Sequence, residues 1–169
     1  LLRAGLERLI DEAERAMTDS LSVVSDVVEN KKVVAGGGAV EIEVAKELRK
    51  YANKVGGREQ LAIEAFADAM EIIPRSLSEN AGLEPIDILV ALRSAHDKPD
   101  GIYQGVNVFT GEIQNSIENG IIEPAVVKEQ ALKSAAESAA MILRIDDVIS
   151  SSKPKGGPGG PGGMPGGEE

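Results

Sequence analysis

The sequence predicts a mainly α-helical protein in which several packed helices are joined by a few short strands. Apolar residues recur with helical spacing over most of the 169 residues. Aromatic residues make up only 2% of the sequence and Trp is absent, so Ala, Val, Ile and Leu must build the core. Stretches that alternate apolar with polar residues, as half-buried strands do, are short and few. Together these features favour close helix–helix packing over a large sheet.

The helical pattern falls into five runs, which cover residues 6–28, 39–55, 59–73, 86–95 and 124–142. Proline removes a backbone donor and clashes with the preceding turn, so Pro74 should break or kink the third run, with a short continuation to Asn80. Pro85 suits the first turn of the fourth run. Gly56 and Gly57 follow the second run and suit a helix end.

Short β structure is predicted at residues 33–35 and in a hairpin around residues 106–113, with its turn at Thr110 and Gly111. A short helix should follow the hairpin and stop at Gly120. Residues 143–149 either extend the last helix or form a short strand. From Ser151 onward the chain is rich in Gly and Pro and lacks apolar groups to offset the entropy of ordering, so this tail should be disordered.

The composition argues against several classes of partner and site. A net charge of −10 disfavours a nucleic-acid or anionic-membrane surface. The absence of Cys excludes disulfides and thiolate metal sites, and it agrees with the reducing conditions of a cytoplasmic protein. No apolar run approaches the ~20 residues that a membrane span needs. The sequence begins at Leu1 rather than Met, which we interpret as a hint of truncation.

The candidate chemistry lies in a glycine run and one aspartate. The phosphate loop GxxxxGK[ST] and the motifs HExxH and GxSxG are absent, and His96, the only histidine, is interpreted as a polar residue near a helix end. Gly36, Gly37 and Gly38 lie between a short strand and a helix start, which suits anion binding, although three glycines alone are more often a flexible turn. Asp19 lies among apolar positions of the first helical run, where it either has a task or is simply exposed.

Several short segments, taken together and in order, resemble one protein family. They are residues 19–21 (DSL), 33–41 (VVAGGGAVE), 60–67 (QLAIEAFA), 73–75 (IPR), 80–82 (NAG), 105–108 (GVNV), 120–124 (GIIEP) and 144–149 (RIDDVI). This set resembles the group II chaperonins, which comprise the archaeal thermosome and its eukaryotic cytosolic relatives, and it is most similar to the archaeal kind. The resemblance covers residues 1–149.

The resemblance implies a subunit of two stacked rings that enclose a cavity where non-native polypeptides fold. The partners it implies are the other subunits of the double ring and these polypeptides, with neither nucleic acid nor membrane involved. Residues 1–18 would be the C-terminal limb of the intermediate domain, residues 19–150 the C-terminal half of the equatorial ATP-binding domain, and residues 151–169 the tail. The family's N-terminal phosphate-binding motifs and its apical domain are absent, so the chain alone is expected to be inactive.

The resemblance also implies a role for each candidate residue. The residues that would contact ATP are Gly36, Gly37, Gly38, Asn107, Val108 and Glu123. Asn107 and Val108 match the hairpin beside the adenine, and Glu123 matches the carboxylate that takes the ribose hydroxyls. Asp19 matches the catalytic aspartate that helps position the attacking water. Mg²⁺ is the expected metal, but its principal ligand belongs to the N-terminal part that this sequence lacks, so no metal ligand is assigned here.

Two departures from the family pattern bear on these roles. Ala4 and Leu6 stand where Gly and Thr are expected, and the tail has Met164 as its only methionine, where many relatives repeat Gly-Gly-Met.

The alternative function is a non-enzymatic helical assembly module, in which the glycines and Asp19 are structural. A self-sufficient NTPase is disfavoured because no second phosphate-binding loop is present.

Overall fold

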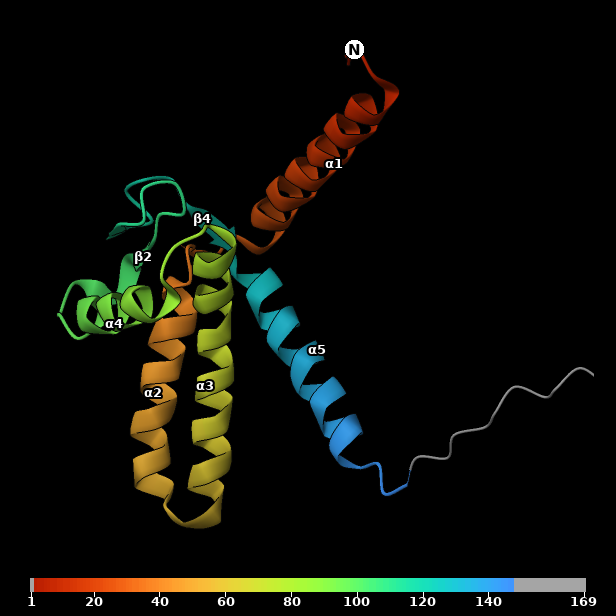
Figure 1. The fold of residues 1–169 in the computed structure, drawn as a ribbon. Helices are drawn as coiled ribbons and strands as arrows, with labels where there is room; N and C mark the ends of the chain where they lie inside the picture. The colour runs from red at the N-terminus through yellow and green to blue at the C-terminus, as the bar shows by residue number, and fades with distance from the viewer. Residues whose placement is uncertain (1, 148–169) are drawn as a thin grey trace, which may run out of the picture. The chain divides into compact units, whose positions relative to one another are not determined.

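The computed structural model describes residues 2–147, and it confirms a mainly α-helical fold with short strands (Figure 1). Its elements are α1 (Glu7–Asn30), β1 (Val33–Ala35), α2 (Ala39–Val55), α3 (Gly57–Asn80), α4 (Pro85–His96), the 3₁₀ turn η1 (Gly101–Tyr103), β2 (Gln104–Val106), β3 (Ile113–Asn115), β4 (Ile122–Pro124) and α5 (Ala125–Leu143). The chain divides into two units, Leu1–Leu132 and Lys133–Glu169. The predicted disordered tail lies outside the described residues.

Helices α2 and α3 form an antiparallel pair that is the largest contact in the structure (Figure 1). Gly56 and Gly57 connect them, and both have the left-handed φ values, +68° and +70°, that glycine adopts without strain. Ala45, Ala52 and Ala67 are fully buried, and small side chains let two helix backbones approach closely. The alanine-rich sequence therefore produces a tight helical hairpin.

A second layer of packing joins this hairpin to α4 and to the β2–β3 hairpin. The buried side chains that meet there are Ile42 of α2, Ile88 and Leu92 of α4, and Val106 of β2. Val106 pairs with Ile113 in the antiparallel β2–β3 register. The core thus holds the loop after Val106 at a fixed place beside the start of α2.

Of the two outcomes predicted for Pro74, a break or a kink with a continuation to Asn80, the structure excludes the break and confirms the continuation. The helix continues through Pro74 to Asn80, and Pro74 is buried inside it. The pyrrolidine ring packs beneath Gly38, where an added Cβ would lie only 2.6 Å from Pro74 Cβ. Tertiary packing here outweighs the cost of the missing backbone donor.

The β structure departs from the prediction in two places. Strand β4 was missed, and it pairs antiparallel with β1. The predicted short helix before Gly120 is wrong, because residues 116–120 form turns. Asn115 Oδ1 accepts hydrogen bonds from the backbone N–H groups of Ile117 (3.1 Å) and Glu118 (3.4 Å), a local bond that competes with a helix. Gly120 then closes the turn with φ +73°.

One buried carboxylate joins α2, α3 and α4. Glu71 of α3, whose side chain is 6% exposed, lies 2.6 Å from Arg49 Nη1 of α2 and also pairs with Arg93 of α4. Burial by itself would raise the pKa of Glu71, but the hydrogen bonds and charges of the two guanidinium groups lower it to about 2. Arg49 also binds the exposed Asp68 at 2.7 Å. Glu71 is therefore a fully compensated ion-pair centre.

His96, the last residue of α4, is fully buried and connects three elements. Its Nε2 donates to the Gln104 carbonyl of β2 at 2.8 Å, and its Nδ1 lies 2.8 Å from Glu43 Oε2 of α2. Burial would raise the pKa of Glu43, but hydrogen bonds from His96 and Lys46 outweigh it and lower the pKa. The sequence placed His96 correctly at a helix end, and the structure gives it a packing role.

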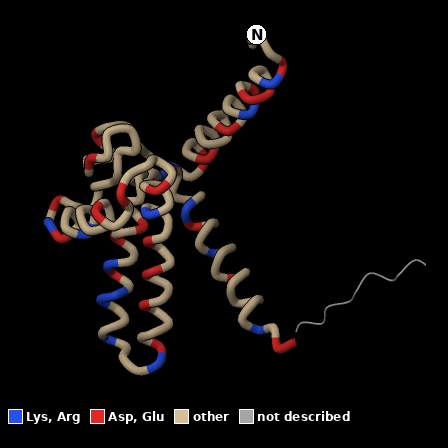
Figure 2. The backbone as a smooth tube through the Cα atoms, in the orientation of Figure 1, with Lys and Arg blue, Asp and Glu red and all other residues tan. Residues whose placement is uncertain are grey.

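Helix α1 differs from the others because it has no buried residue. Its apolar face is exposed at Leu9, Met17, Leu21, Val24 and Val28. Figure 2 shows acidic and basic residues interspersed along the rest of this helix. No helix within residues 2–147 combines the length and the apolar character that crossing a membrane requires. The periodicity of residues 6–28 thus predicts the helix correctly, although nothing described here covers its apolar face.

Candidate functional site

The β1–β4 ribbon brings the glycine run beside Glu123. In its antiparallel register Val34 pairs with Glu123 and Ala35 with Ile122. The ladder continues one step further, because the Gly36 N–H donates to the Ile121 carbonyl at 2.9 Å. A Cβ added at Gly36 would lie 3.0 Å from Glu123 Oε1, so this carboxylate oxygen sits directly against the loop.

The β2–β3 hairpin closes on the glycine run from another side. The Val106 N–H donates to the Gly37 carbonyl at 2.9 Å, and the buried Ser116 Oγ donates to the Gly36 carbonyl at 2.9 Å. Gly105 lies so close that a Cβ there would be 2.4 Å from Gly36 O. These backbone contacts fix the glycine run against the hairpin, and they thereby position Asn107, which directly follows Val106.

Each residue of the glycine run is required by its surroundings. Gly37 and Gly38 have φ values of +68° and +81°, a left-handed conformation that strains other residues. An added Cβ would lie 2.9 Å from Ile121 Cγ2 at Gly36, 2.9 Å from Val106 O at Gly37 and 2.6 Å from Pro74 Cβ at Gly38. Protein packing alone therefore accounts for glycine at all three positions, independently of any ligand.

The loop ends at the N-terminus of α2, where Gly38 is the N-cap residue and no side chain caps the helix. Unpaired N–H groups and the helix dipole favour an anion at such an end. The carboxylate of Glu41 lies in the first turn but is buried and paired with Lys128. The strand–glycine–helix arrangement that the sequence predicts is thus present.

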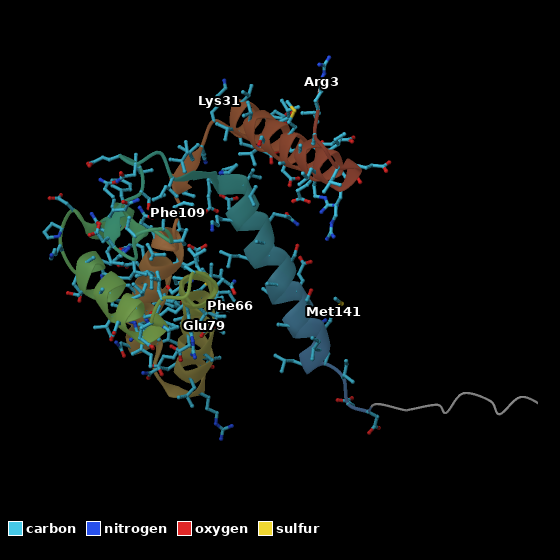
Figure 3. The ribbon with its side chains drawn as sticks, turned by 45° about the horizontal axis from the view of Figure 1, so that its top comes forward. Arg3, Lys31, Phe66, Glu79, Phe109 and Met141 are labelled. Atoms are coloured by element: carbon cyan, nitrogen blue, oxygen red, sulfur yellow. The ribbon has the colours of Figure 1, made fainter. Side chains whose placement is uncertain are left out.

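Asn107 and Val108 lie in the loop between β2 and β3. Asn107 Oδ1 accepts from the backbone N–H groups of Phe109 (2.9 Å) and Thr110 (3.3 Å), and its Nδ2 donates to Gln114 Oε1 at 3.2 Å. The Val108 side chain packs against the core. Both side chains are thus used within the hairpin. At its tip Phe109, labelled in Figure 3, is 96% exposed.

Lys128, which was not predicted as a site residue, lies next to the Glu123 carboxylate. Lys128 Nζ is 2.8 Å from Glu123 Oε2 and 2.5 Å from Glu41 Oε1. Burial would lower the pKa of Lys128, but its hydrogen bonds to Glu123 and Glu41 raise it, so it stays charged. Glu41 is only 1% exposed, and its Oε2 has no hydrogen-bond partner among the described residues.

Asp19 stands apart from the other predicted site residues. It is exposed in the middle of α1, and no hydrogen bond or ion pair within the described residues joins it to the glycine run or to Glu123. Asp19 precedes the end of α1 by 11 residues, which corresponds to about 16 Å along the helix axis. The structure therefore brings together six of the predicted residues and leaves the seventh outside the cluster.

Sequence reasoning missed Lys128, Glu41 and Ser116 because their roles depend on pairing over long separations. Lys128 and Glu41 are 87 residues apart, and Ser116 and Gly36 are 80 apart. One signal was available, since Glu41 follows the glycine run within the first turn of a helix, where an acidic residue favours the dipole. Among residues 2–147 no group of three or more His, Cys, Asp or Glu is placed to hold a metal ion.

Comparison with known proteins gives consistent matches over most of the chain. The model of the TCP-1/cpn60 chaperonin family matches residues 1–153. A thermosome subunit from Methanocaldococcus jannaschii is 54% identical over 100% of this chain, which covers 31% of that protein. The thermosome subunit beta of Thermoplasma acidophilum is 58% identical over 89% of this chain and 28% of its own length.

A solved structure supports the same assignment. The open-state monomer of a group II chaperonin from Methanococcoides burtonii matches with a TM-score of 0.72 and 50% identity, over 86% of this chain and 36% of that one. This chain thus spans about a third of the length of the relatives that it matches. The motifs, the fold and these matches agree, and the chain belongs to the TCP-1/cpn60 chaperonin family.

Proposed function

We propose that this chain is part of a subunit of an ATP-dependent cytoplasmic chaperone, and that it contributes about half of the ATP-binding and hydrolysis site. In the intact protein, ATP hydrolysis would drive the folding of non-native polypeptides inside a double ring formed with other subunits. The names of the thermosome and chaperonin relatives support the chaperone assignment. The chain alone, which lacks the rest of the site, would be inactive.

One observation carries the proposal, namely the meeting of three distant segments at one place. Gly36 and Gly37 bond the carbonyl of Ile121 and the N–H of Val106, respectively, and Glu123 Oε1 lies against Gly36. These are the segments to which the family resemblance gives nucleotide contacts. Packing explains why these segments meet, but an assembly module gives no role to a partly exposed carboxylate beside an uncapped helix N-terminus.

Each segment has a role that suits one part of a nucleotide. The uncapped N-terminus of α2, after Gly38, favours a phosphate. Glu123, whose side chain is 36% exposed, can accept hydrogen bonds from the ribose hydroxyls. The loop at Asn107 and Val108 would contribute its backbone beside the adenine, since both side chains are used within the hairpin.

Asp19 is proposed to orient the water that attacks the γ-phosphate, a task in which protein groups supply positioning and charge. This assignment rests on the family resemblance, because Asp19 is exposed on α1 in the structure. Mg²⁺ would neutralise the phosphate charges. The described residues offer no cluster that fits it, and its principal ligand is proposed to lie in the part of the subunit that this chain does not contain.

The test compares two substitutions in the full-length protein. Asp19→Ala should lower ATP turnover about 10²-fold or more while ATP affinity is largely kept, because positioning the attacking water matters mainly in the transition state. Glu123→Ala should weaken ATP affinity about tenfold or more and change saturated turnover less. Steady-state hydrolysis and equilibrium nucleotide titrations measure the two effects.

Two exposed carboxylates provide matched controls. Asp11 lies on α1 two turns before Asp19, and Glu129 lies on α5 beside Lys128 in sequence. Substitution of either by Ala should leave turnover and affinity near those of the unmodified protein. Normal turnover in the Asp19 variant would refute its catalytic role, and a full-length protein that binds no ATP would refute the nucleotide site itself.

One observation favours the alternative of a non-enzymatic assembly module. Protein atoms fill the space beside all three glycines, so packing accounts for them without a ligand. In addition, α1 has no buried residue and exposes most of its apolar face. The two functions separate on nucleotide dependence: an assembly module predicts that Asp19→Ala and Glu123→Ala change neither turnover nor nucleotide affinity.

A further inference from the structure

Lys128 lies between two carboxylates that differ in exposure and in position relative to the glycine run. Glu123 is partly exposed and touches the glycine loop, whereas Glu41 is buried in the first turn of α2. Lys128 Nζ bonds one oxygen of each, at 2.8 Å from Glu123 Oε2 and 2.5 Å from Glu41 Oε1. A single ammonium group therefore links the glycine-run helix to the end of the ribbon.

The lysine contacts the Glu123 carboxylate at Oε2, while Oε1 lies beside Gly36, 3.0 Å from where a Cβ would be. The β1–β4 register fixes the Glu123 backbone, but a glutamate side chain has three rotatable bonds and would otherwise sample many rotamers. Fixing Oε2 thus fixes the direction in which Oε1 presents its lone pairs.

Glu41 in turn holds Lys128. Its buried carboxylate has Lys128 as its hydrogen-bond partner at Oε1, and its Oε2 has none among the described residues. A buried carboxylate without compensation is costly, so the ammonium group is strongly held at this point. Lys128 carries one positive charge, whereas Glu41 and Glu123 each carry one negative charge. Because one ammonium group does not neutralise both carboxylates, Glu123 keeps negative charge with which it can accept hydrogen bonds.

We propose that Lys128, anchored by the buried Glu41, is a positioning residue that orients the Glu123 carboxylate toward the hydroxyls of a bound nucleoside sugar. This inference rests on the proposed nucleotide site and deepens it. It adds two residues, from α2 and α5, to a contact that the family resemblance assigns to Glu123 alone. Lys128 itself does not touch the nucleotide.

The test uses a ligand pair that isolates the sugar contact, ATP and 2′,3′-dideoxy-ATP, titrated against the full-length protein. Loss of hydrogen bonds to a charged group should weaken dideoxy-ATP binding to the unmodified protein about tenfold or more relative to ATP. Lys128→Met leaves the buried Glu41 without a counter-charge, so the pair Glu41→Gln/Lys128→Met, which removes both charges, is measured in parallel. Lys128→Arg keeps the cation and serves as the conservative variant.

We expect the preference for ATP over dideoxy-ATP to fall to about twofold in the variants without the cation and to survive in Lys128→Arg. Equal weakening of both nucleotides, with the preference intact, would mean that Lys128 is only structural and would overturn the inference. If the unmodified protein binds both nucleotides equally, the sugar contact of Glu123 is wrong and the inference falls with it. If it binds neither, the proposed nucleotide site fails as a whole.

Discussion

Two buried glutamates, one in each of two regions of the molecule, show opposite ways of keeping a carboxylate inside a protein. Glu71, where α2, α3 and α4 meet, has two arginines, and Arg93 contacts both of its oxygens. Glu41, at the start of α2, has one oxygen paired with Lys128, and the other has no partner within residues 2–147. Lys128 is moreover shared with Glu123.

The difference distinguishes an ion pair that is part of the helix packing from one that lies at the proposed nucleotide site. At Glu71 two arginines bind one buried carboxylate, and their hydrogen bonds and charges lower its pKa despite burial, although Arg49 also pairs with the exposed Asp68. At Glu41 one cation serves two anions, and the second anion, Glu123, is partly exposed at the glycine run. A cluster that is incompletely compensated and open to solvent can respond to a ligand. The fully compensated one stabilises the packing of helices.

The largest effect that would sharpen this comparison is on stability at Glu71. Glu71→Ala should lower the free energy of unfolding by about 2–3 kcal/mol, because it leaves Arg49 and Arg93 without their shared anion. Asp68→Ala, which removes the 71%-exposed partner of the same Arg49, should cost less than about 1 kcal/mol. Urea unfolding of the full-length protein measures both. Equal losses in the two variants would show that burial of Glu71 is not what matters.

A related effect should appear in acid. The folded-state pKa of Glu71 is about 2, below the ordinary value of 4.5. The stabilisation by Glu71 should therefore be complete above about pH 4.5 and disappear as the pH falls toward 2. The stability difference between the unmodified protein and Glu71→Gln should shrink over that interval. A difference that stays constant down to pH 2 would contradict the paired state of this carboxylate.

The smallest effect is expected at Glu41. Glu41→Gln keeps an oxygen that can accept from Lys128, and it removes a buried charge of which one oxygen, Oε2, has no partner in the described part of the chain, so the two changes partly cancel. The free energy of unfolding should change by about 1 kcal/mol or less. A loss as large as that of Glu71→Ala, measured by the same urea titration, would erase the distinction between the two clusters.

The sequence predicted most of the helices and the strand–glycine–helix arrangement, and its failures have identifiable causes. Periodicity identified the extents of α1 and α2 closely because it reports which face is apolar. It could not report that α1 buries nothing, since partners are not encoded in spacing. The sequence could not decide whether Pro74 breaks the helix, because the packing beneath Gly38 that keeps Pro74 inside α3 is a long-range contact. Strand β4 was missed because three residues that end in proline carry little strand signal.

In the candidate site, too, local motifs were recognisable from the sequence, whereas long-range contacts were not. The strand–glycine–helix pattern and Glu123 were recognisable as local motifs or by resemblance, and the structure brings them together. Lys128 was not recognisable, because its role arises from two partners far apart in the sequence. Asn107 lies beside the glycine run, as the resemblance implied, but its side chain bonds its own turn, which local sequence does not reveal. Long-range pairing is what sequence reasoning lacks.

The β1–β4 ribbon has a consequence for how the protein is made. Its register joins Val33 to Pro124, so the ladder can close only after about ninety intervening residues have been synthesised and the entropy of closing that loop has been met. The α2–α3 hairpin, by contrast, is local and can form as soon as Asn80 emerges. On a ribosome the helical hairpin would therefore form first. The glycine run could contact the Glu123 carboxylate only after translation had passed Glu123.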